Sequence, residues 1–377
     1  MEGMPARGRL LVVRLEPSHK EGGKSLPDAQ TQARRPRARR QRDADRLPGP
    51  PLQVRSGAAG VKPRRARGAL WGVVLAGGEG TRLARYVEGR FGVRVPKQYC
   101  VFSGTRSMLQ HTLARADFLI PRERVLTVID AGHAGIANRQ LADRPVGTVL
   151  RQPRNLGTAP GMLLPLVEIL ARDPDANVVF LPSDHFVGDE RRFMFYVAAA
   201  ERLLERIDRK IVLLGMLPDE PESEYGYLQT GAELGTLAGA SAWTVRRFCE
   251  KPNADRAAEY CRAGYLWNTF VVVAKAAELY RLIVSRLPKI GERFERIREH
   301  WTGEFRDFAL AGEYLSMESA NVSEAVFETS PERIAVMPVW GVRWSDWGSP
   351  DRLEDALRNL GPASAPLPAF TAAKASA

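Results

Sequence analysis

Residues Leu70–Lys97 read LWGVVLAGGEGTRLARYVEGRFGVRVPK, and this stretch decides the fold. The apolar run Leu70–Leu75 stops at Gly77-Gly78, which predicts a buried strand followed by a tightly bent loop. Glycines let backbone N–H groups approach an anion closely, and Arg82 can fork onto phosphate oxygens. The stretch therefore predicts a phosphate site between strand and loop, with a tight turn beside a sheet as the purely structural alternative.

Two common glycine motifs do not fit this loop. A GxxxxGK[ST] phosphate loop requires a Gly-Lys-Ser/Thr sequence, and none follows here. The dinucleotide GxGxxG pattern fails because Leu83 stands where the third glycine is needed. Lys97 adds one more cation after Arg82. The loop thus remains a candidate phosphate site of another kind.

The net charge of +11 is confined to one end of the 377-residue chain. Residues 1–68 hold 17 Lys and Arg against 6 Asp and Glu, and the remaining 38 basic and 38 acidic residues cancel. Residues 1–68 are Arg- and Pro-rich with little apolar periodicity, so they are predicted to be a disordered basic extension. A nucleic-acid-binding arm and a targeting presequence stay open as alternatives, but nucleic acid is not the expected partner of the balanced remainder.

Several functional classes are not favoured by the composition. No apolar run approaches the ~20 residues that a membrane helix requires, so no membrane partner is expected. The three cysteines, Cys100, Cys249 and Cys261, lack CxxC spacing and suit a reducing cytoplasm. The five histidines show no zinc-ligand spacing.

Apolar runs alternate with helical patterns from residue 69 onward, which is typical of an α/β fold. Strands are expected at 70–75, 124–129, 148–150, 177–181, 210–215, 243–248, 266–273 and 336–344. Helices are expected at 107–116, 162–172, 190–207, 253–264, 276–287, 291–300 and 350–360. The predicted domains are an extension at 1–68, a catalytic domain at 69–360 and a flexible tail at 361–377.

Two aspartates follow predicted strands directly. Asp184 comes after the continuous apolar strand 177–181, and Asp346 follows the last strand between Trp344 and Trp347. Open α/β sheets place their ligands at the carboxyl ends of strands, and a carboxylate there requires a partner. Together the two aspartates could hold one Mg²⁺ that bridges substrate phosphates. The structural alternative for Asp184 is the cap of the following segment.

Further polar groups follow other strands. Glu250-Lys251 offers a cation for a second phosphate, or is simply a solvated surface pair. Tyr225-Gly226-Tyr227 and Trp267-Asn268 offer stacking faces, close backbone approach and an amide for sugar hydroxyls, although each could belong to the core.

Taken in order, these stretches resemble the sugar-nucleotide pyrophosphorylases, in particular the mannose-1-phosphate guanylyltransferase branch. The resemblance covers roughly residues 70–360. The motifs that carry it are LAGGEGTRL at 75–83, PKQY at 96–99, QPRNLGTAP at 152–160, PSDH at 182–185, EYGYL at 224–228, FCEKP at 248–252, WNTF at 267–270 and WSDWGSP at 344–350.

The resemblance implies a Rossmann-like mixed, mostly parallel sheet of the nucleotide-diphospho-sugar transferase type. It implies transfer of a nucleotide from a nucleoside triphosphate, with GTP favoured, to a hexose 1-phosphate, with mannose 1-phosphate favoured, and release of pyrophosphate. The residues implied are Arg82, Lys97 and Asp184 for catalysis; Ala76, Gly77, Gly78, Gly80, Thr81, Gln152, Gly157 and Thr158 for the nucleotide; Gly226, Glu250, Lys251 and Asn268 for the sugar phosphate; and Asp184 with Asp346 for Mg²⁺.

The chain departs from the family pattern at two places. Ala84-Arg85-Tyr86 stands where relatives usually have Trp-Pro-Leu, and Trp267–Val272 reads WNTFVV where they read WNSGMF. The second departure leaves the hexose open. The resemblance further implies that the cupin isomerase or left-handed β-helix domain of longer relatives is absent. The alternatives are a uridylyl-, thymidylyl- or adenylyltransferase and a non-catalytic regulatory homologue, and the sequence leaves a homodimer open.

Overall fold

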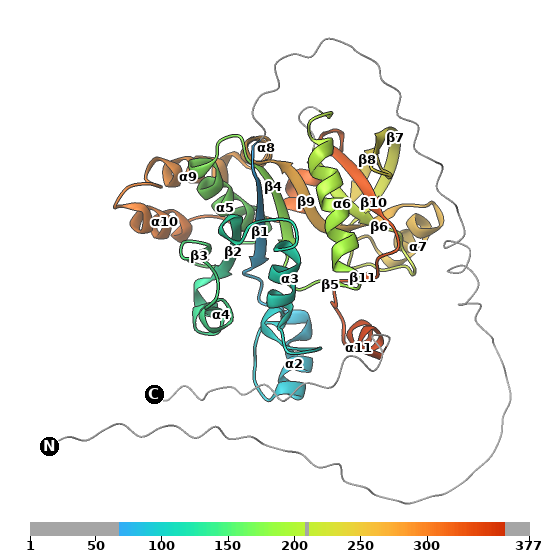
Figure 1. Ribbon diagram of the computed structural model, residues 1–377, viewed down its shortest axis with the longest axis horizontal. Coiled ribbons are helices and arrows are strands. Elements are labelled where there is room, and N and C mark those ends of the chain that lie inside the picture. Colours follow the sequence, from blue (N-terminus) through green and yellow to red (C-terminus); the bar gives the residue numbers. More distant parts are fainter. Residues whose placement is uncertain (1–67, 208–210, 359–377) are drawn as a thin grey trace, which may run out of the picture. The chain divides into compact units, whose positions relative to one another are not determined.

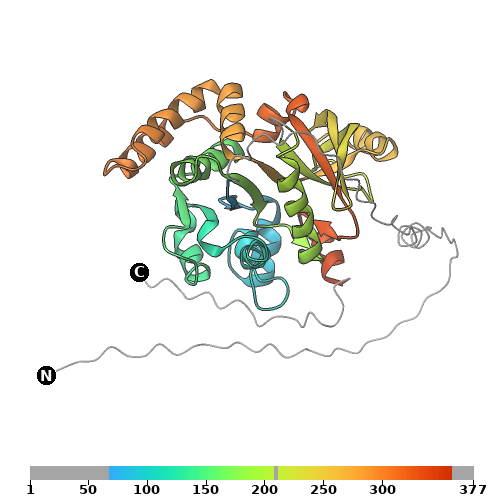
Figure 2. The ribbon, with the colours of Figure 1, turned by 45° about the horizontal axis from the view of Figure 1, so that its top comes forward.

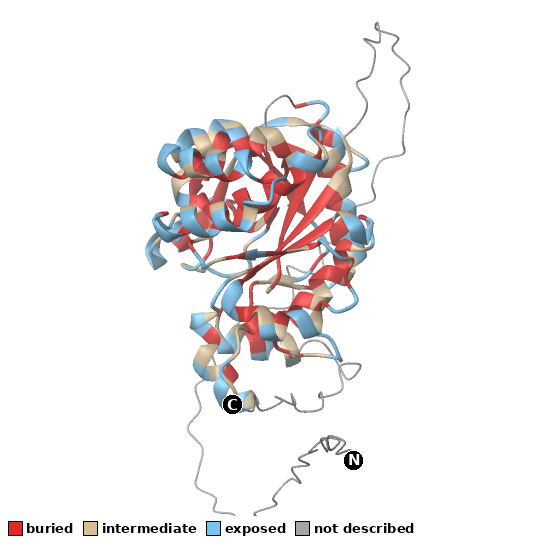
Figure 3. Ribbon diagram, turned by 90° about the vertical axis from the view of Figure 1, so that its left-hand side faces the viewer, coloured by how far each residue is buried: buried red, intermediate tan, exposed pale blue. Residues whose placement is uncertain are grey.

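Side-chain alternation along the strands explains how the central sheet is covered. In the computed structural model, which describes residues 68–207 and 211–358, strand β1 (Leu70–Ala76) directs Trp71 and Val73 to one face and Val74 and Ala76 to the other. Each face joins its own hydrophobic core, so the strand is buried on both sides. Figure 3 shows the same arrangement for the whole sheet, with buried strands between two exposed helical layers.

The described residues form a nine-stranded sheet in the order β3-β2-β1-β4-β9-β6-β10-β8-β7, and β7 also pairs with β9. All its strands except β8 and β9 run in one direction, which confirms the predicted mixed, mostly parallel α/β sheet. Its strands are β1, β2 (Val125–Asp130), β3 (Val149–Gln152), β4 (Asn177–Pro182), β6 (Ile211–Met216), β7 (Tyr227–Leu237), β8 (Ala240–Cys249), β9 (Leu266–Lys275) and β10 (Ile334–Val339).

Helices cover both faces of this sheet (Figure 1). One core includes side chains of α5 (Thr158–Arg172), α8 (Ala276–Arg286), α9 (Pro288–Glu299) and α10 (Arg306–Leu315). The other includes α3 (Met108–Ala116), α4 (Ala134–Gln140), α6 (Glu190–Leu203) and α7 (Ala254–Arg262), and Figure 2 shows the sheet and its helices from a second direction. A smaller third core joins α2 (Ala84–Phe91) to α11 (Pro350–Arg358). No helix in the described residues is long and apolar enough to cross a membrane.

A separate two-stranded sheet is formed by residues next to the two predicted aspartates. Strands β5 (Phe186–Val187) and β11 (Trp344–Ser345) pair antiparallel and lie next to Asp184 and Asp346 in the sequence. The prediction of one continuous strand over 336–344 is wrong, because β10 ends at Val339 and β11 is a separate strand. The chain between them bends at Gly341, whose φ is +69°.

Other differences from the predicted elements have local causes. Helix α5 begins at Thr158 rather than 162, because Pro160 lies in the first turn, where a missing N–H costs nothing. Helix α6 ends at Leu203 rather than 207. Strand β7 was not predicted, since Gly231 and Gly235 interrupt its pattern. Helices α2 and α10 were not predicted either.

Part of the predicted organisation lies outside the described residues. The extension predicted at 1–68, apart from Gly68, and the tail predicted at 361–377 are among the residues that the structure does not describe. The boundaries 69–360 of the catalytic domain stay a prediction. All the predicted site residues fall within the described ranges.

Candidate active site

The glycine loop follows β1 at the carboxyl end of the strand, where open α/β sheets bind ligands. Its path is fixed by the segment that contains Lys97. Gln98 Nε2 donates hydrogen bonds to the carbonyl oxygens of Ala76 (3.0 Å) and Gly78 (2.7 Å), and Tyr99 donates to Ala76 as well (3.2 Å). Gly80 has φ +62°, and a Cβ there would lie 3.0 Å from the Lys97 backbone nitrogen. These contacts therefore hold the glycine loop against the segment Pro96–Tyr99.

The loop continues into a turn of 3₁₀ helix at Thr81–Leu83 and then into α2. No side chain caps the first of these at Gly80. Backbone N–H groups at such a turn are available to an anion. The phosphate contacts predicted for Gly80, Thr81 and Arg82 stay a prediction.

Gln152, at the end of β3, lies against the start of the loop. A Cβ on Gly77 would lie 2.4 Å from Gln152 Nε2, whereas nothing comes within 4 Å of a Cβ on Gly78. Gln152 is 2% exposed, and its Oε1 accepts no hydrogen bond within the described part of the chain. A buried acceptor without a donor is costly. The Gln152 amide lies between Gly77 and Gly161, and its contact with the base stays a prediction.

Four predicted residues from four separated motifs meet at the carboxyl edge of the sheet. Lys97 is 4% exposed, and its ammonium lies 3.1 Å from Asp184 Oδ2 and donates to the Asp346 carbonyl oxygen at 2.5 Å. Arg82 Nη2 lies 3.0 Å from Asp346 Oδ2. The structure therefore brings together the two strand-end carboxylates and the two cations.

Contacts that the sequence did not predict hold Asp346 in place. Its Oδ1 accepts hydrogen bonds from the Tyr225 hydroxyl (2.7 Å) and the Gly348 backbone N–H (2.8 Å). Arg352 lies 3.6 Å from the same oxygen and packs over the Tyr225 ring. A Cβ on Gly348 would collide with Asp346 and Arg82. The WSDWGSP motif contained Gly348, but nothing in the sequence connected Tyr225 or Arg352 with Asp346.

Both carboxylates are ionised near neutral pH. Burial alone raises the pKa of Asp346, but Lys97 and Arg352 outweigh it and bring that pKa to about 2. The pKa of Asp184 is lowered as well, because Lys97 offsets burial and the repulsion of Asp346. Burial lowers the pKa of His185 to about 4, so this imidazole is neutral. Asp184 keeps 32% of its side chain exposed and is accessible to a ligand.

The predicted sugar-phosphate residues also converge. A Cβ on Gly226 would lie 2.8 Å from Glu250 Oε2 and 3.3 Å from the Asn268 Cβ, so the three residues are close together. Asn268 donates its backbone N–H to the Gly226 carbonyl (2.8 Å) and accepts from Phe270 N through Oδ1 (3.0 Å). These contacts fix the orientation of the amide.

Glu224 links this group to the cations. One of its carboxylate oxygens lies 3.9 Å from Lys251 Nζ and 3.4 Å from Arg82 Nη1. All three side chains are nearly half exposed, so their attractions are weak. A substrate phosphate could replace the Glu224 carboxylate between Arg82 and Lys251 at little cost.

Gly157 and Thr158 have a structural role that the sequence did not indicate. A Cβ on Gly157 would lie 2.5 Å from the Ala320 carbonyl oxygen. The Thr158 hydroxyl donates to Asn321 Oδ1 (3.2 Å) and accepts from the Val322 N–H (2.8 Å). These contacts hold the segment Ser319–Glu328, which we call the bridging segment, against the start of α5. Their predicted contact with the base stays a prediction.

The bridging segment also reaches the sugar half. It includes a π-helical turn at Ser323–Phe327, a form often found at functional sites. Burial raises the pKa of Glu250 to about 7, Lys251 opposes that rise, and Glu324 and Glu328 add to it; a hydrogen bond with Ser323 lowers it. One segment therefore contacts residues predicted for both substrates.

Comparisons with known proteins agree with this geometry. The family model described as Nucleotidyl transferase matches residues 71–361. Xanthan biosynthesis protein XanB of Xanthomonas campestris is 29% identical over 300 residues, 78% of this chain and 60% of XanB. Mannose-1-phosphate guanylyltransferase RfbM of Salmonella typhimurium is 30% identical over 290 residues, 75% of this chain and 58% of RfbM.

A solved structure is similar as well. The mannose-1-phosphate geranyltransferase of Thermus thermophilus superposes with a TM-score of 0.62 at 28% identity, over 74% of this chain and 76% of that one. The chain spans about 60% of the length of the curated relatives it matches. Because the family model covers most of the chain and all eight motifs lie within its limits, the chain belongs to the nucleotidyl transferase family.

Proposed function

We propose that the protein transfers a nucleotide from a nucleoside triphosphate to a hexose 1-phosphate, forming a nucleoside-diphosphate sugar and pyrophosphate. The observation that supports this best is the cluster of Lys97, Asp184, Asp346 and Arg82 next to the glycine loop. Mannose 1-phosphate and GTP are the favoured substrates, since relatives such as RfbM are named mannose-1-phosphate guanylyltransferases.

The reaction needs no protein nucleophile. An oxygen of the sugar 1-phosphate, already anionic, attacks the α-phosphorus in line, and pyrophosphate leaves. Catalysis then depends on positioning and on neutralising charge. Arg82 and Lys97 stabilise the charge on the departing pyrophosphate, while Lys251 orients the attacking phosphate.

The donor set at the carboxylates fits Mg²⁺. Asp184 and Asp346 offer hard oxygen ligands and are ionised at neutral pH. No group of three or more His, Cys, Asp or Glu suited to a metal occurs in residues 68–207 and 211–358, so phosphates and water would supply the other ligands. When bound, Mg²⁺ supplies charge neutralisation at the α-phosphate.

Gln152 is the residue that we propose for the base edge. Its buried Oε1 has no hydrogen-bond donor within the described residues. Guanine, uracil, thymine and adenine all carry an N–H donor, so this acceptor does not choose among them. GTP is favoured by the name of the relatives, and UTP, dTTP and ATP are the alternatives.

The three free thiols, Cys100, Cys249 and Cys261, are compatible with a reducing compartment. We therefore place the proposed reaction in the cytoplasm.

The test is pyrophosphate release by the full chain with Mg²⁺ across GTP, UTP, dTTP and ATP, each with mannose 1-phosphate and glucose 1-phosphate. The proposal expects the highest kcat/KM with GTP and mannose 1-phosphate. A higher kcat/KM with UTP or dTTP would mean that the preferred base is uracil or thymine rather than guanine. No release with any pair would favour a sugar-nucleotide-binding regulator and contradict the proposal.

A further inference from the structure

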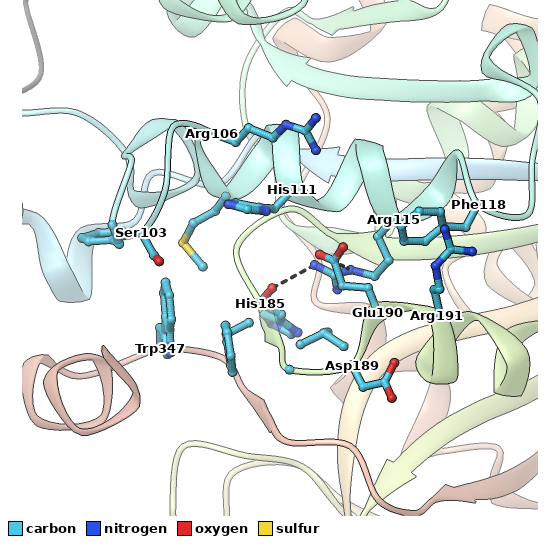
Figure 4. Close-up of a pocket in the computed structure, with 15 residues that line it drawn as sticks. Ser103, Arg106, His111, Arg115, Phe118, His185, Asp189, Glu190, Arg191 and Trp347 are labelled. Carbon is cyan, nitrogen blue, oxygen red and sulfur yellow. Dashed lines mark hydrogen bonds and ion pairs between the residues drawn. The ribbon is translucent and has the colours of Figure 1, made fainter. Parts of the chain in front are cut away.

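A cavity of about 590 Å³ lies beside the candidate active site and shares no lining residue with the predicted substrate contacts. It is bounded by α3, by β5, by the start of α6 and by Trp347 (Figure 4). Aromatic rings form much of its wall, and they are Phe102, Phe118, Phe186 and Trp347. A cavity of this size and lining is typical of a site for a small ligand.

The charges around the cavity favour an anion. Arg115 is occupied, because it lies 3.6 Å from Glu190 and donates to the His185 carbonyl oxygen. Within the described ranges, no carboxylate forms an ion pair with Arg106 or Arg191. Both are exposed, and Figure 4 shows them on different segments, Arg106 just before α3 and Arg191 on α6. Arg191 also lies in the first turn of α6, whose N-terminal end attracts negative charge.

The remaining groups do not reverse this balance. Asp189 accepts a hydrogen bond from the Arg192 N–H and caps α6. Burial lowers the pKa of His111, so its imidazole adds no charge at neutral pH. Arg191 lies over the Phe118 ring, 4.6 Å from its centroid, and this contact leaves its charge uncompensated. The cavity thus combines flat apolar walls with two cations that lack a carboxylate partner in the described chain.

The cavity wall is continuous with the candidate active site. Phe186 lies two residues after Asp184, and Trp347 directly follows Asp346. The two rings stack, with centroids 5.1 Å apart and planes 6° from parallel. Lys97 donates to the carbonyl oxygen of Asp346 and lies 3.5 Å from that of Trp347. The residues that carry these rings are thus next to the two carboxylates in the chain, and Lys97 contacts the Trp347 backbone.

We propose that this cavity binds a small ligand with a flat apolar body and an anionic group, and that its occupancy changes the activity of the neighbouring site. The apolar body lies against Phe118, Phe186 and Trp347, and the anion contacts Arg106 or Arg191. The binding step is independent of the proposed function, whereas the effect on turnover rests on it.

Binding can be measured with the full chain and two matched fluorescent probes. Anilinonaphthalene sulfonate carries an aromatic body with an anion, and phenylnaphthylamine is the same body without the anion. We expect one saturable site for the sulfonate and weaker binding of the neutral probe. R106Q and R191Q should weaken sulfonate binding, with about a tenfold rise in Kd for at least one of them. Binding of the neutral probe should stay the same.

Phenylalanine variants locate the probe. F118A should raise the Kd of both probes about tenfold, because it removes an apolar wall. Phe195 on the same side of the sheet is equally exposed, at 45% against 46%, but does not line the cavity. F195A should leave both values unchanged, as should F308A on α10, where Phe308 is 81% exposed. Loss of binding in F308A or F195A, or unchanged binding in F118A, R106Q and R191Q, would overturn the site.

Measurements of turnover test separately whether occupancy of the cavity changes the activity of the neighbouring site, which we call the coupling. Saturating sulfonate probe should change the rate of pyrophosphate release in the wild type and not in F118A, whose basal rate should equal that of the wild type. Binding at the cavity with an unchanged rate would overturn the coupling. A wild type that binds the probe but releases no pyrophosphate with any substrate would contradict the proposed function and the coupling, while the binding site would stand.

Discussion

At the scale of single residues, Lys97 connects both predicted aspartates with the segment that holds the glycine loop. Its buried ammonium contacts the Asp184 carboxylate and the Asp346 backbone, while the following Gln98 and Tyr99 hold the glycine loop. The sequence predicted the cation and both carboxylates, because strand ends and motif order placed them together. It named Tyr225 only as a stacking face, and it did not predict the contacts of Gln98, Tyr225 or Arg352.

A substitution at Gly78 tests nucleotide binding without a change in stability. Nothing lies within 4 Å of a Cβ at this position, so Gly78→Ala should leave the thermal midpoint nearly unchanged. The methyl group would project into the space assigned to the nucleotide, and KM for GTP should rise about tenfold or more. Gly77→Ala is the contrast, since its Cβ would collide with Gln152 and should lower stability as well. A Gly78→Ala protein with unchanged KM would contradict the nucleotide assignment.

Glu250 should make stability depend on pH. Burial raises its pKa to about 7 in the folded protein, above the ordinary carboxyl value, so the folded state binds this proton more tightly than the unfolded state. Its contribution to stability is therefore present at acidic pH and is lost as pH rises toward and through 7. Glu250→Gln stays neutral and should gain stability relative to the wild type between pH 5 and pH 8.

Denaturant unfolding at the two pH values measures this difference. Glu318→Gln is a suitable control, because the Glu318 side chain is 70% exposed and should follow the wild type. An equal pH response of Glu250→Gln and the wild type would show that Glu250 is ionised in the folded state throughout this range.

At the scale of elements, local patterns predicted the strands with continuous apolar runs, such as β1, β2 and β4. They failed where glycine or proline obscured the pattern, as in β7 and at the start of α5. They also gave no role to the bridging segment Ser319–Glu328. Its function in the fold depends on Gly157, Thr158 and Glu250, and these contacts arise only after the chain has folded.

Gly157→Ala tests the bridging segment. Gly157 has φ +85° and ψ −176°, a conformation that only glycine adopts readily, and its Cβ would overlap the Ala320 carbonyl. Strain and overpacking together should cost about 3 kcal/mol or more of unfolding free energy. Gly104 has φ +70° but open space around it, so Gly104→Ala should cost only about 1–2 kcal/mol. Similar losses in the two variants would mean that the contact with Ala320 is not important.

At the scale of the whole molecule, one mixed sheet carries both the motifs predicted to bind the nucleotide and those predicted to bind the sugar phosphate. The family match at residues 71–361 includes every predicted site residue. The alternation of strands and helices predicted the α/β class, but it could not give the strand order. Insertion of β9 between β4 and β6 is a long-range pairing that no local signal contains.

Removal of residues 1–67 should leave catalysis intact. The positive charge of the chain is concentrated there, while every candidate site residue lies beyond it. We expect kcat/KM for pyrophosphate release to stay within about twofold of the full chain, because binding at the site depends on nearby charges rather than on net charge. A large loss would show that these residues take part in the reaction, and a nucleic-acid-binding assay of both proteins would test the alternative role.

The most direct test of the account is the kcat/KM of pyrophosphate release by Asp184→Asn under the best substrate pair. Asp143→Asn is the matched control, because Asp143 forms a surface ion pair with Arg122 and is 66% exposed. We predict a loss of about 10²–10³-fold for Asp184→Asn, the scale known for single charge-stabilising groups, and none for the control. A folded Asp184→Asn protein with nearly full kcat/KM would contradict this role of Asp184.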